Sequence, residues 1–293
     1  MHIPVLLKET IDLLNVKKGG RYIDATLGLG GHSLEILRYG GRVLGIEVDE
    51  ESLEEAKRLI GSKIKFVRAD FKDIKRIAEE NDFVPCDGVL FDLGMSSWQL
   101  EESGRGFSFQ KEEPLDMRMN KSLAVTAADL LNSLSRDELT KLFQKYGGEQ
   151  PARRVASAVV RARTLKPFET TGDLVGVVRG IKGNRGKIHP ATKVFQALRI
   201  AVNDEIENLR SALPQAFKIL VKGGRMAVIS FHSLEDGEVK RFFKGLAGEG
   251  VGEIVTKKPI TPAVQEIKAN PRARSAKLRV IKKDGKEGKR EKS

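Results

Sequence analysis

Strand-like and helix-like segments alternate along about the first ninety residues, and this alternation constrains the fold more than any other feature of the chain. Four short apolar segments bounded by turn residues have the pattern of strands: RYIDA, RVLGIEV, IKFVR and DGVLFD. Between them lie HSLEILRYG, DEESLEEAKRLIG and FKDIKRIAEEN, whose apolar residues recur at helical spacing. Because strands joined by helical crossovers pair in parallel, this order predicts an α/β fold around a parallel sheet.

The alternation stops after the fourth strand-like segment, near Pro114. From there to about Leu213 there is no convincing strand, and helical patterns occupy SRDELTKLFQKYGG, PARRVASAVVRAR, GDLVGVVRGI and ATKVFQALRIAVNDEIENLRSAL. The first opens with the capping-box pair Ser135 and Glu138, and the last is predicted to be one long helix. Strand signals return in GGRMAVISF and, more weakly, in GEIVTKK and AKLRVIKK.

This order predicts two domains, one of them discontinuous. We expect an α/β domain at 1–113 and 214–293, interrupted by an all-helical domain at 114–213. A chain of 293 residues is long enough for one large core and a smaller second unit. About the last 12 residues, KKDGKEGKREKS, contain no apolar side chain and are predicted to form a flexible basic tail.

Composition excludes several classes of protein. The single cysteine, Cys86, excludes an internal disulfide framework and is predicted to be a small buried hydrophobe. The four histidines are scattered without metal-ligand spacing, so no metal site is expected. The N-terminus lacks the pattern of a signal peptide, and no segment approaches the roughly 20 apolar residues of a membrane span. These features predict a soluble cytoplasmic protein that does not associate with membranes.

The net charge of +12 is concentrated in two stretches. From Pro151 to Ile200 there are 11 Lys/Arg and 2 Asp/Glu, a local balance of +9. From Thr256 to Ser293 there are 13 basic and 4 acidic residues, which again gives +9 and leaves the rest of the chain mildly acidic. Solvated helix faces and a basic tail could account for such stretches, but we favour a polyanion, and specifically nucleic acid, as the partner of the first.

A glycine-rich turn follows the first strand-like segment directly. Gly28, Gly30 and Gly31 allow the backbone to approach a ligand, and the next helix would direct its N-terminus at that ligand. Glu47 ends the second strand, where a carboxylate can accept hydrogen bonds from both hydroxyls of a ribose. Dinucleotide and S-adenosylmethionine sites both begin in this way, and a plain tight turn would look similar. The motif G-x-x-x-x-G-K-[ST] is absent, which argues against a phosphate-clamping NTPase.

The fourth strand-like segment discriminates between the two cofactors. Its sequence, GVLFDLGMSSWQL, places Asp92 at the end of the strand, followed by polar residues such as Ser96, Ser97 and Gln99. Methyltransferases that use S-adenosylmethionine carry polar groups at this point, beside the methyl donor, to hold the accepting atom. A dehydrogenase would need a proton-transfer partner for hydride transfer, and we find no assembled candidate. An S-adenosylmethionine site is therefore favoured.

The chain resembles the bacterial RsmH (MraW) family nearly end to end. The resemblance rests on HIPVLLKE, DATLGLGGHS, DLGMSSWQL, RGFSF, PLDMRMN, HPATKVFQALRIAVNDE, GGRMAVISFHSLED and NPRARSAKLR. That family methylates N4 of a cytidine in the decoding region of 16S ribosomal RNA of the small subunit. The resemblance implies a class I methyltransferase fold with an inserted helical domain, S-adenosyl-L-methionine as cofactor and S-adenosyl-L-homocysteine as product.

The resemblance also implies a set of cofactor contacts. By position they are Gly30, Gly31, His32, Glu47, Phe71, Asp92 and Gln99. Two positions depart from the family pattern. Glu47 stands where the family often has Asp, which lengthens the reach to the ribose, and Trp98 stands where proline is commoner. Trp98 could stack on the target base or cover the pocket as a lip residue. His32 could contact the cofactor or only cap the helix that follows the turn.

Three residues are predicted to act in methyl transfer. The exocyclic amine of cytosine is a poor nucleophile, so it needs an acceptor that pulls on an N–H as charge develops. Asp92, or a loop oxygen near Ser96, is the predicted acceptor. His232, in ISFHSLED, follows a strand expected beside the fourth and should flank the acceptor pocket, while Ser233 could cap the next helix.

A polynucleotide substrate would be held through its phosphates by cations of the helical domain. The candidates are Arg153, Arg154, Arg161, Arg163, Lys187 and Arg199. Asp116 and Arg118 could pair with each other or contact RNA. Two rival functions stay open, an NAD-dependent oxidoreductase and a non-catalytic RNA-binding assembly factor of the small subunit. The sequence also leaves open whether the protein forms a homodimer.

Overall fold

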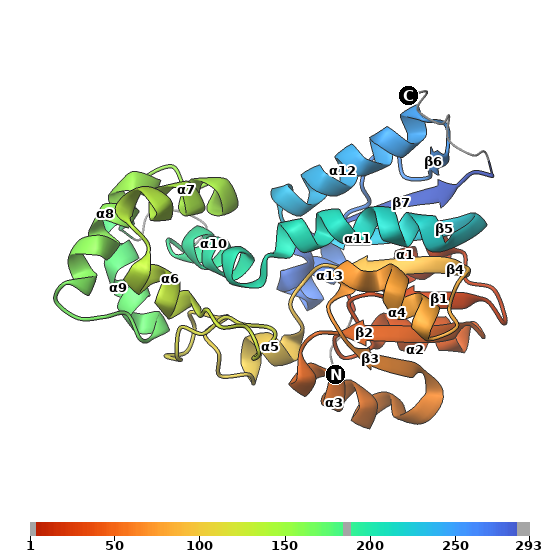
Figure 1. The fold of residues 1–293 in the computed structure, drawn as a ribbon, viewed down its shortest axis with the longest axis horizontal. Coiled ribbons are helices and arrows are strands. Elements are labelled where there is room, and N and C mark those ends of the chain that lie inside the picture. Colours follow the sequence, from red (N-terminus) through yellow and green to blue (C-terminus); the bar gives the residue numbers. More distant parts are fainter. Residues whose placement is uncertain (1–3, 184–188, 286–293) are drawn as a thin grey trace. The chain divides into compact units, whose positions relative to one another are not determined.

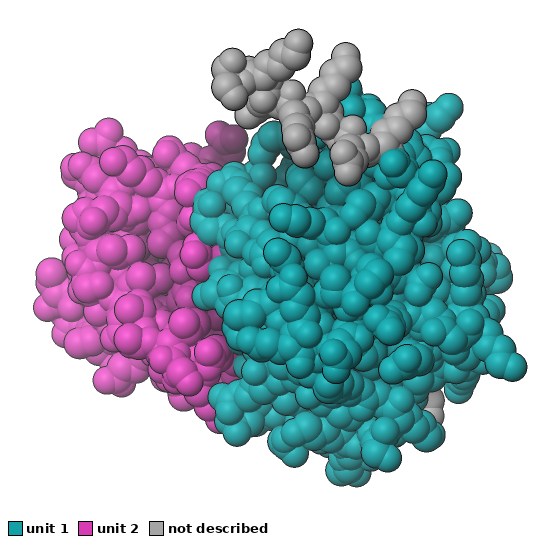
Figure 2. All heavy atoms as spheres, turned by 45° about the vertical axis from the view of Figure 1, so that its right-hand side comes forward, with its two compact units in different colours: residues 1–96, 206–293 teal, residues 97–205 magenta. Residues whose placement is uncertain are grey.

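The computed structural model describes residues 4–183 and 189–285. The chain forms two compact units, which Figure 2 shows in different colours. Unit 1 comprises Met1–Ser96 and Ile206–Ser293, and unit 2 comprises Ser97–Glu205. In the described ranges, no helix is both long and apolar enough to cross a membrane.

Unit 1 is built around one seven-stranded sheet (Figure 1). Its strands are β1 (Arg21–Asp24), β2 (Arg42–Glu47), β3 (Lys65–Arg68), β4 (Cys86–Asp92), β5 (Leu220–Ser230), β6 (Gly252–Ile254) and β7 (Lys277–Lys283). Their order is β3-β2-β1-β4-β5-β7-β6. The pairs among β1 to β5 are parallel, and β7 is antiparallel to both β5 and β6. The predicted α/β class I methyltransferase fold, with a mostly parallel seven-stranded sheet, is confirmed.

Strand order reverses between β1 and β4, which are neighbours in the sheet although β2 and β3 intervene in the chain. In an open parallel sheet, ligands bind beyond the carboxyl ends of the strands at such a point. Asp24, Glu47 and Asp92 are the last residues of β1, β2 and β4. The topology therefore brings these three carboxyl groups to one edge of the sheet.

Helices cover both faces of this sheet. They are α1 (Leu7–Leu14), α2 (Gly31–Arg38), α3 (Glu50–Ile60), α4 (Ile74–Glu80), α11 (Glu205–Ile219), α12 (Ser233–Gly248) and α13 (Val264–Ala269), with short 3₁₀ turns η1 (Gly61–Lys63), η2 (Phe71–Asp73) and η3 (Pro271–Ser275). Successive strand residues point to opposite faces. Thus Ile23 joins the cluster under α4, α11 and α12, and its neighbour Tyr22 joins the cluster under α1, α2 and α3.

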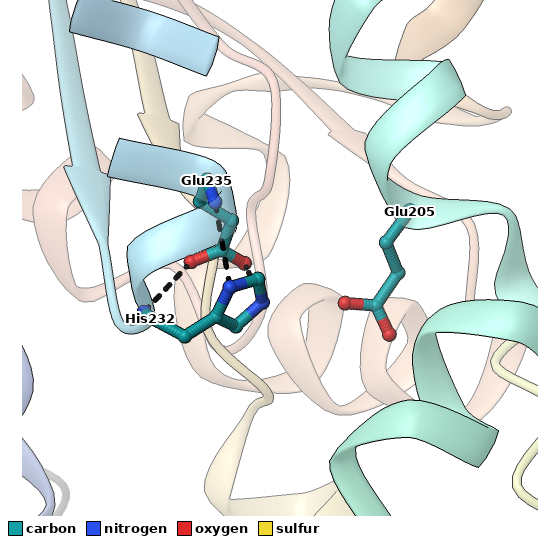
Figure 3. A group of neighbouring side chains, drawn as sticks. All are labelled: Glu205, His232 and Glu235. Atoms are coloured by element: carbon teal, nitrogen blue, oxygen red, sulfur yellow. Dashed lines mark hydrogen bonds and ion pairs between the residues drawn. The ribbon is translucent and has the colours of Figure 1, made fainter. Parts of the chain in front are cut away.

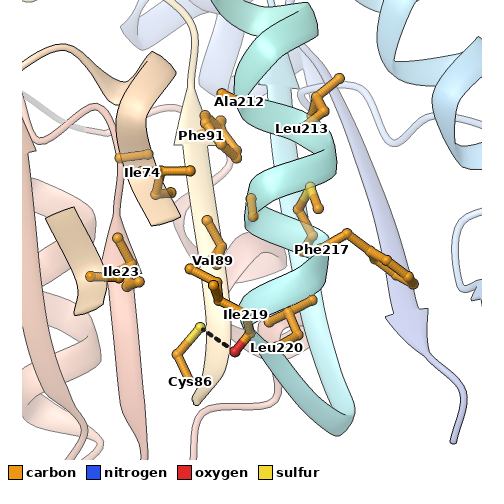
Figure 4. Packing of buried hydrophobic residues seen from close by; sticks show 14 of the residues in the cluster. Ile23, Ile74, Cys86, Val89, Phe91, Ala212, Leu213, Phe217, Ile219 and Leu220 are labelled. Atoms are coloured by element: carbon orange, nitrogen blue, oxygen red, sulfur yellow. Dashed lines mark hydrogen bonds between the residues drawn. The ribbon is translucent and has the colours of Figure 1, made fainter. Parts of the chain in front are cut away.

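The first of these clusters is shown in Figure 4, where Ile74 of α4 and Leu213 of α11 pack with Phe91 of β4. Cys86 is fully buried in it, and its thiol donates to the carbonyl of Ile219 at 3.7 Å. Burial raises the pKa of this thiol to about 12. The prediction that Cys86 behaves as a small buried hydrophobe is confirmed.

Unit 2 is helical. It contains α5 (Ser97–Glu101), α6 (Ala127–Ser133), α7 (Arg136–Gly147), α8 (Ala152–Arg163), α9 (Thr171–Lys182) and α10 (Thr192–Asn203). Its described residues form no strand, only an isolated bridge between Pro114 and Thr170. The predicted capping box of Ser135 and Glu138 is present at the start of α7. Unit 2 buries its own apolar side chains, including Phe143 of α7 and Leu198 of α10.

The prediction of a single long helix from residue 191 to 213 is wrong, because the structure has two helices there, α10 and α11. Asp204 adopts a left-handed conformation, with φ 52°, and separates α10 from α11. Asp tolerates this conformation better than most residues, so the chain can turn there without glycine. The apolar periodicity continues on both sides of the break, which is why it did not reveal the break.

The boundaries of the two units differ from the expected domain boundaries. We expected them at 113/114 and 213/214, and the units meet at 96/97 and 205/206. Residues 97–113 belong to unit 2, where the hydroxyl of Thr171 donates to the carbonyl of Lys111 at 2.8 Å. α11 belongs to unit 1 from Ile206 onward, because Leu209 and Leu213 are buried in the cluster under the sheet.

Candidate active site

The glycine turn between β1 and α2 is cross-linked to the end of β2. Gly28 has φ 51° and donates its N–H to Oε2 of Glu47 at 2.8 Å. The N–H of Asp49 donates to Oε1 of the same carboxylate at 2.9 Å. Each carboxylate oxygen has a second lone pair, so Glu47 can still accept two hydroxyl protons. Burial raises the pKa of Glu47 to about 7, which indicates how strongly this site disfavours negative charge while it is shielded from water.

Two glycines of the turn are required by close approach. Gly30, the N-cap of α2, has φ 77°, and a Cβ there would overlap the side chain of Ile60. A Cβ on Gly31 would overlap the ring of Pro4. The turn is thus held tightly against α3 and against the N-terminal segment. The expectation that its backbone also contacts a cofactor stays a prediction.

Asp24, which sequence analysis did not single out, ends β1 at the same sheet edge as Glu47 and Asp92. It is 2% exposed, and its Oδ2 accepts a hydrogen bond from the hydroxyl of Ser33 at 2.7 Å. Burial raises its pKa to about 6. The sequence signal was present, because Asp24 ends the strand immediately before the glycine turn, at the edge where strand order reverses.

Asp92 has one carboxylate oxygen without a hydrogen-bond partner. Its backbone N–H donates to the hydroxyl of Thr26 at 2.6 Å, which fixes the end of β4 against the turn. Its side chain is 24% exposed, yet Oδ1 is buried and has no partner among the described residues. Burial, followed by the negative charges of Asp24 and Glu235, raises the pKa of Asp92 to about 8. A buried acceptor without a donor from the protein is available to accept a hydrogen bond from water or from a ligand.

His32 lies between the N-terminal segment and Asp92. Its Nε2 lies 3.1 Å from the carbonyl oxygen of Val5, and its Nδ1 lies 3.6 Å from Oδ2 of Asp92. The alternative that His32 caps α2 is wrong, because Gly30 is the N-cap and no side chain caps that helix. Direct contact with a cofactor stays a prediction.

His232 is the N-cap of α12 (Figure 3). Its Nδ1 accepts from the N–H of Glu235 at 3.4 Å, and Oε2 of Glu235 accepts from the N–H groups of Phe231 and His232 at 2.7 and 3.3 Å. The expectation that Ser233 caps this helix is therefore wrong. Histidine is an uncommon N-cap residue, and here Glu235 completes the capping box with it.

The loop after β4 begins in unit 1. The hydroxyl of Ser96 lies 3.2 Å from that of Ser52 on α3. A Cβ on Gly94 would come within 2.9 Å of the ring of Phe231, so β5 and this loop approach closely. Phe71, in η2, makes an edge-to-face contact with Phe91 at 5.7 Å between ring centroids.

The structure brings most of the predicted cofactor residues together in unit 1. These are Gly30, Gly31, His32, Glu47, Phe71 and Asp92. Trp98 and Gln99 belong to unit 2, in α5, where Gln99 is 4% exposed and its carbonyl accepts from the hydroxyl of Ser103 at 2.6 Å.

Unit 2 separates the predicted RNA contacts into two kinds. Arg153, Arg154 and Arg161 lie exposed on α8. Arg163, on the same helix, instead donates through Nη1 to the carbonyls of residues 131 and 134, both at 2.7 Å. Arg199 makes a bidentate pair with Glu205 at 2.8 and 2.9 Å. Arg163 and Arg199 thus hold unit 2 together.

Two further predicted residues remain. Lys187 lies outside the described residues. Arg118 pairs with both carboxylate oxygens of Asp116 at 2.7 and 2.8 Å, which supports the structural alternative for that motif.

Comparison with known proteins identifies the family. The model of the MraW methylase family matches residues 1–284. Proteins named ribosomal RNA small subunit methyltransferase H are similar: that of Dictyoglomus thermophilum is 48% identical over 288 residues, and that of Coprothermobacter proteolyticus 46% over 286. Each alignment covers 96% of this chain and 96% of the relative. A solved rRNA methylase from Streptococcus thermophilus aligns with 97% of this chain and 99% of its own, at 11% identity and a TM-score of 0.46. With a family model spanning nearly the whole chain and relatives at this identity, the chain belongs to the MraW methylase family.

Proposed function

We propose that this protein transfers a methyl group from S-adenosyl-L-methionine to N4 of a cytidine in the decoding region of 16S rRNA, in the small ribosomal subunit and in the cytoplasm. Membership of a methylase family makes the protein a methyltransferase with S-adenosylmethionine as its cofactor. The names of its relatives support ribosomal RNA of the small subunit as the substrate class. The buried and unpartnered Oδ1 of Asp92 is the observation that supports an amine as the accepting group.

The residues at the sheet edge fit the cofactor. Glu47 would accept the ribose hydroxyls with the lone pairs that Gly28 and Asp49 leave unused. Asp24 and Asp92 are the carboxyl groups that would lie near the sulfonium of a bound cofactor, and that cation would favour their ionised forms. When bound, the cofactor supplies an electrophilic methyl group, and S-adenosylhomocysteine is the product.

Asp92 is the proposed catalytic acceptor. Its Oδ1 can accept an N–H of the exocyclic amine, which directs the nitrogen lone pair and stabilises the positive charge that develops on nitrogen. The proton becomes acidic once nitrogen carries the methyl group, so a carboxylate is a sufficient base. Ser96 and His232 are weaker candidates, because the Ser96 hydroxyl already contacts Ser52 and the His232 ring caps α12.

The helical unit is proposed to recognise the RNA. Arg153, Arg154 and Arg161 leave their guanidinium groups exposed on α8, as phosphate contacts require. Reversing these three to Glu should weaken binding to small-subunit RNA and flatten its salt dependence, while S-adenosylhomocysteine affinity stays unchanged. Reversal of three exposed cations of unit 1, Lys57, Arg58 and Lys63, makes the same change of charge and serves as the control.

The test of the function is mass spectrometry of 16S rRNA from cells that lack the gene. N4-methylcytidine should be absent, return with the wild-type gene and fail to return with Asp92→Ala. The exposed Asp137→Ala variant, in α7, should restore it fully. Persistence of the modification in the deletion strain would contradict the proposal. Binding of RNA and cofactor without methyl incorporation would favour the assembly factor instead.

A further inference from the structure

We propose that unit 1 has an RNA-binding surface of its own, formed by exposed cations of the connection between β6 and β7. We call it the β6–β7 surface, and its cations are Lys257, Lys258, Lys268 and Arg274. The ligand is the phosphate backbone of the RNA next to the methylated nucleotide. This inference rests on the proposed function, because it gives the same substrate a second contact, in unit 1 in addition to unit 2.

The second basic stretch of the chain supplies the charge of this surface. From residue 256 to 285 it has 9 Lys/Arg and 2 Asp/Glu. Some of these cations hold β7 in place, through ion pairs with Asp236 and Glu253 and through bonds to backbone carbonyls; they are Lys277, Arg279, Lys282 and Lys283. The cations of the β6–β7 surface are not used in this way.

The β6–β7 surface carries positive charge that the protein leaves unneutralised. In the described ranges, none of its four cations forms an ion pair. Exposed cations on other elements of unit 1 do: Lys57 lies 2.7 Å from Glu54 on α3, and Arg76 lies 3.0 Å from Glu80 on α4. Like charges that gather without acids repel one another, and a polyanion relieves that repulsion by binding to them.

Local structure presents these cations to solvent on an ordered backbone. Ala273 and Ala276 are 0% and 1% exposed in the cluster under α1, α2 and α3, whereas Arg274 between them is exposed. The small alanines let η3 lie close to the sheet, and the arginine points outward. The loop after β6 is held by Ile260, whose N–H and carbonyl bond Leu278 of β7 at 3.0 and 2.8 Å. Little backbone order is therefore lost when a ligand binds here.

Strand register places the β6–β7 surface beside the candidate active site. Asp92 of β4 pairs with Ile229 of β5, which pairs with Leu278 of β7. Two strand spacings put Leu278 about 10 Å from Asp92 across the sheet. β7 is antiparallel to β5 and β6, so the connection that leads from the end of β6 to the start of β7 lies beyond the edge where Asp92 lies.

This position matches what the substrate requires. A base must leave its stack to reach a methyl donor, and the backbone on either side of that base must then be held in the new conformation. Cations near the edge of the sheet can hold phosphates adjacent to the extruded nucleotide. Contacts on unit 2 alone would bind the RNA without fixing the backbone next to Asp92.

The test is a salt titration of binding to protein-free 16S rRNA from cells that lack the gene. The surface variant combines Lys257→Gln, Lys258→Gln, Lys268→Gln and Arg274→Gln. The control variant combines Lys17→Gln, Lys18→Gln, Lys218→Gln and Lys222→Gln, which remove the same charge from exposed lysines near the starts of β1 and β5, at the opposite edge of the sheet. Calorimetry with S-adenosylhomocysteine should give wild-type affinity for both, which shows that they are folded.

We expect the surface variant to bind the RNA about tenfold or more weakly at about 0.1 M salt. Its salt slope should be lower by about two to three, since each lost phosphate contact removes about 0.7 for a single strand. The control variant should keep the wild-type slope.

A crosslinking experiment tests the location. Cys86 is buried and its pKa is raised to about 12, so a thiol introduced at the surface can be labelled selectively. Arg274→Cys carrying a photo-crosslinker should crosslink to the RNA segment around the methylated cytidine in small subunits from the deletion strain. Lys18→Cys with the same reagent should not.

Three results would overturn the inference. The first is a wild-type salt slope in the surface variant, and the second is an equal loss of slope in the control variant. The third is weaker binding to assembled subunits with unchanged binding to free 16S rRNA, which would assign the surface to a ribosomal protein. None of these measurements requires methyl transfer, so failure of the proposed function is recognised separately, by wild-type protein that binds the RNA and leaves it unmethylated.

Discussion

Replacing Asp92 by Asn should stabilise the folded protein at neutral pH. The site holds Asp92 in a buried position beside two other carboxyl groups, which raises its pKa to about 8. In the unfolded chain the same group titrates near 3.9. Between these values the folded protein binds more protons than the unfolded chain, so wild-type stability falls as pH rises from about 4 to about 8. Asn carries no charge to desolvate.

The size of the effect follows from the two pKa values. Each pH unit above 3.9 lowers the free energy of unfolding of the wild type by about 1.36 kcal/mol, until the folded group also ionises. At pH 7 the loss is about 4 kcal/mol. Water reaches the 24% of the side chain that is exposed, so we expect a gain of roughly 2–4 kcal/mol. For a domain of this size, that corresponds to a rise of about 5–10 °C in Tm.

The assay is thermal and urea unfolding of wild type and Asp92→Asn from pH 4 to pH 9. The two stability curves should meet near pH 4, separate up to pH 8 and run parallel above it. The exposed Asp137→Asn variant should follow wild type throughout. A constant difference at all pH values, or a variant less stable than wild type at pH 8, would refute the electrostatic reasoning.

Three further predictions concern the glycine turn, the carboxylate of Glu47 and unit 2. Gly30→Ala places a Cβ against Ile60 at a residue with φ 77°, so calorimetry should show about 1–3 kcal/mol lower stability and weaker S-adenosylhomocysteine binding; wild-type values for both would contradict the requirement for glycine. In the wild-type protein the Glu47 carboxylate accepts hydrogen bonds from the backbone N–H groups of Gly28 and Asp49. Glu47→Gln turns the amide N–H toward one of these donors, so the affinity for S-adenosylhomocysteine should fall about tenfold or more in a folded variant. Arg163→Met removes two hydrogen bonds to backbone carbonyls and should lower Tm by several degrees, whereas Arg161→Met should leave Tm unchanged and reduce the salt slope of RNA binding by about one. A lower Tm in Arg161→Met together with a lower salt slope in Arg163→Met would contradict the roles assigned to these two residues.

Local patterns predicted the elements of the fold better than their connections. The strands and helices around β1 to β4 follow from apolar periodicity, because burial on one face or two imposes that period on the sequence. The break at Asp204 escaped the same reasoning, since the apolar residues keep their phase on both sides of it. A left-handed residue other than glycine leaves only a weak trace in a single sequence.

The candidate site shows the same limit in its side chains. The positions of Glu47 and Asp92 could be predicted from the sequence, because each ends a strand and the order of strands places those ends. The partners of His32 and Arg163 were not, because each bonds a backbone carbonyl that lies 27 to 32 residues away. Such bonds depend on how elements pack and not on any pattern within one element.

The discontinuity of unit 1 has a consequence for the order in which the protein acquires structure during synthesis. β4 pairs on one side with β1 and on the other with β5, but all of unit 2 is made between them. Until Leu220–Ser230 leave the ribosome, β4 is an open sheet edge, and such edges invite pairing with other chains. Unit 2 has its own buried core and can form in that interval. The N–H of Leu6 donates to Oε1 of Glu266 on α13, so this bond of the N-terminal segment forms only when nearly the whole chain is present.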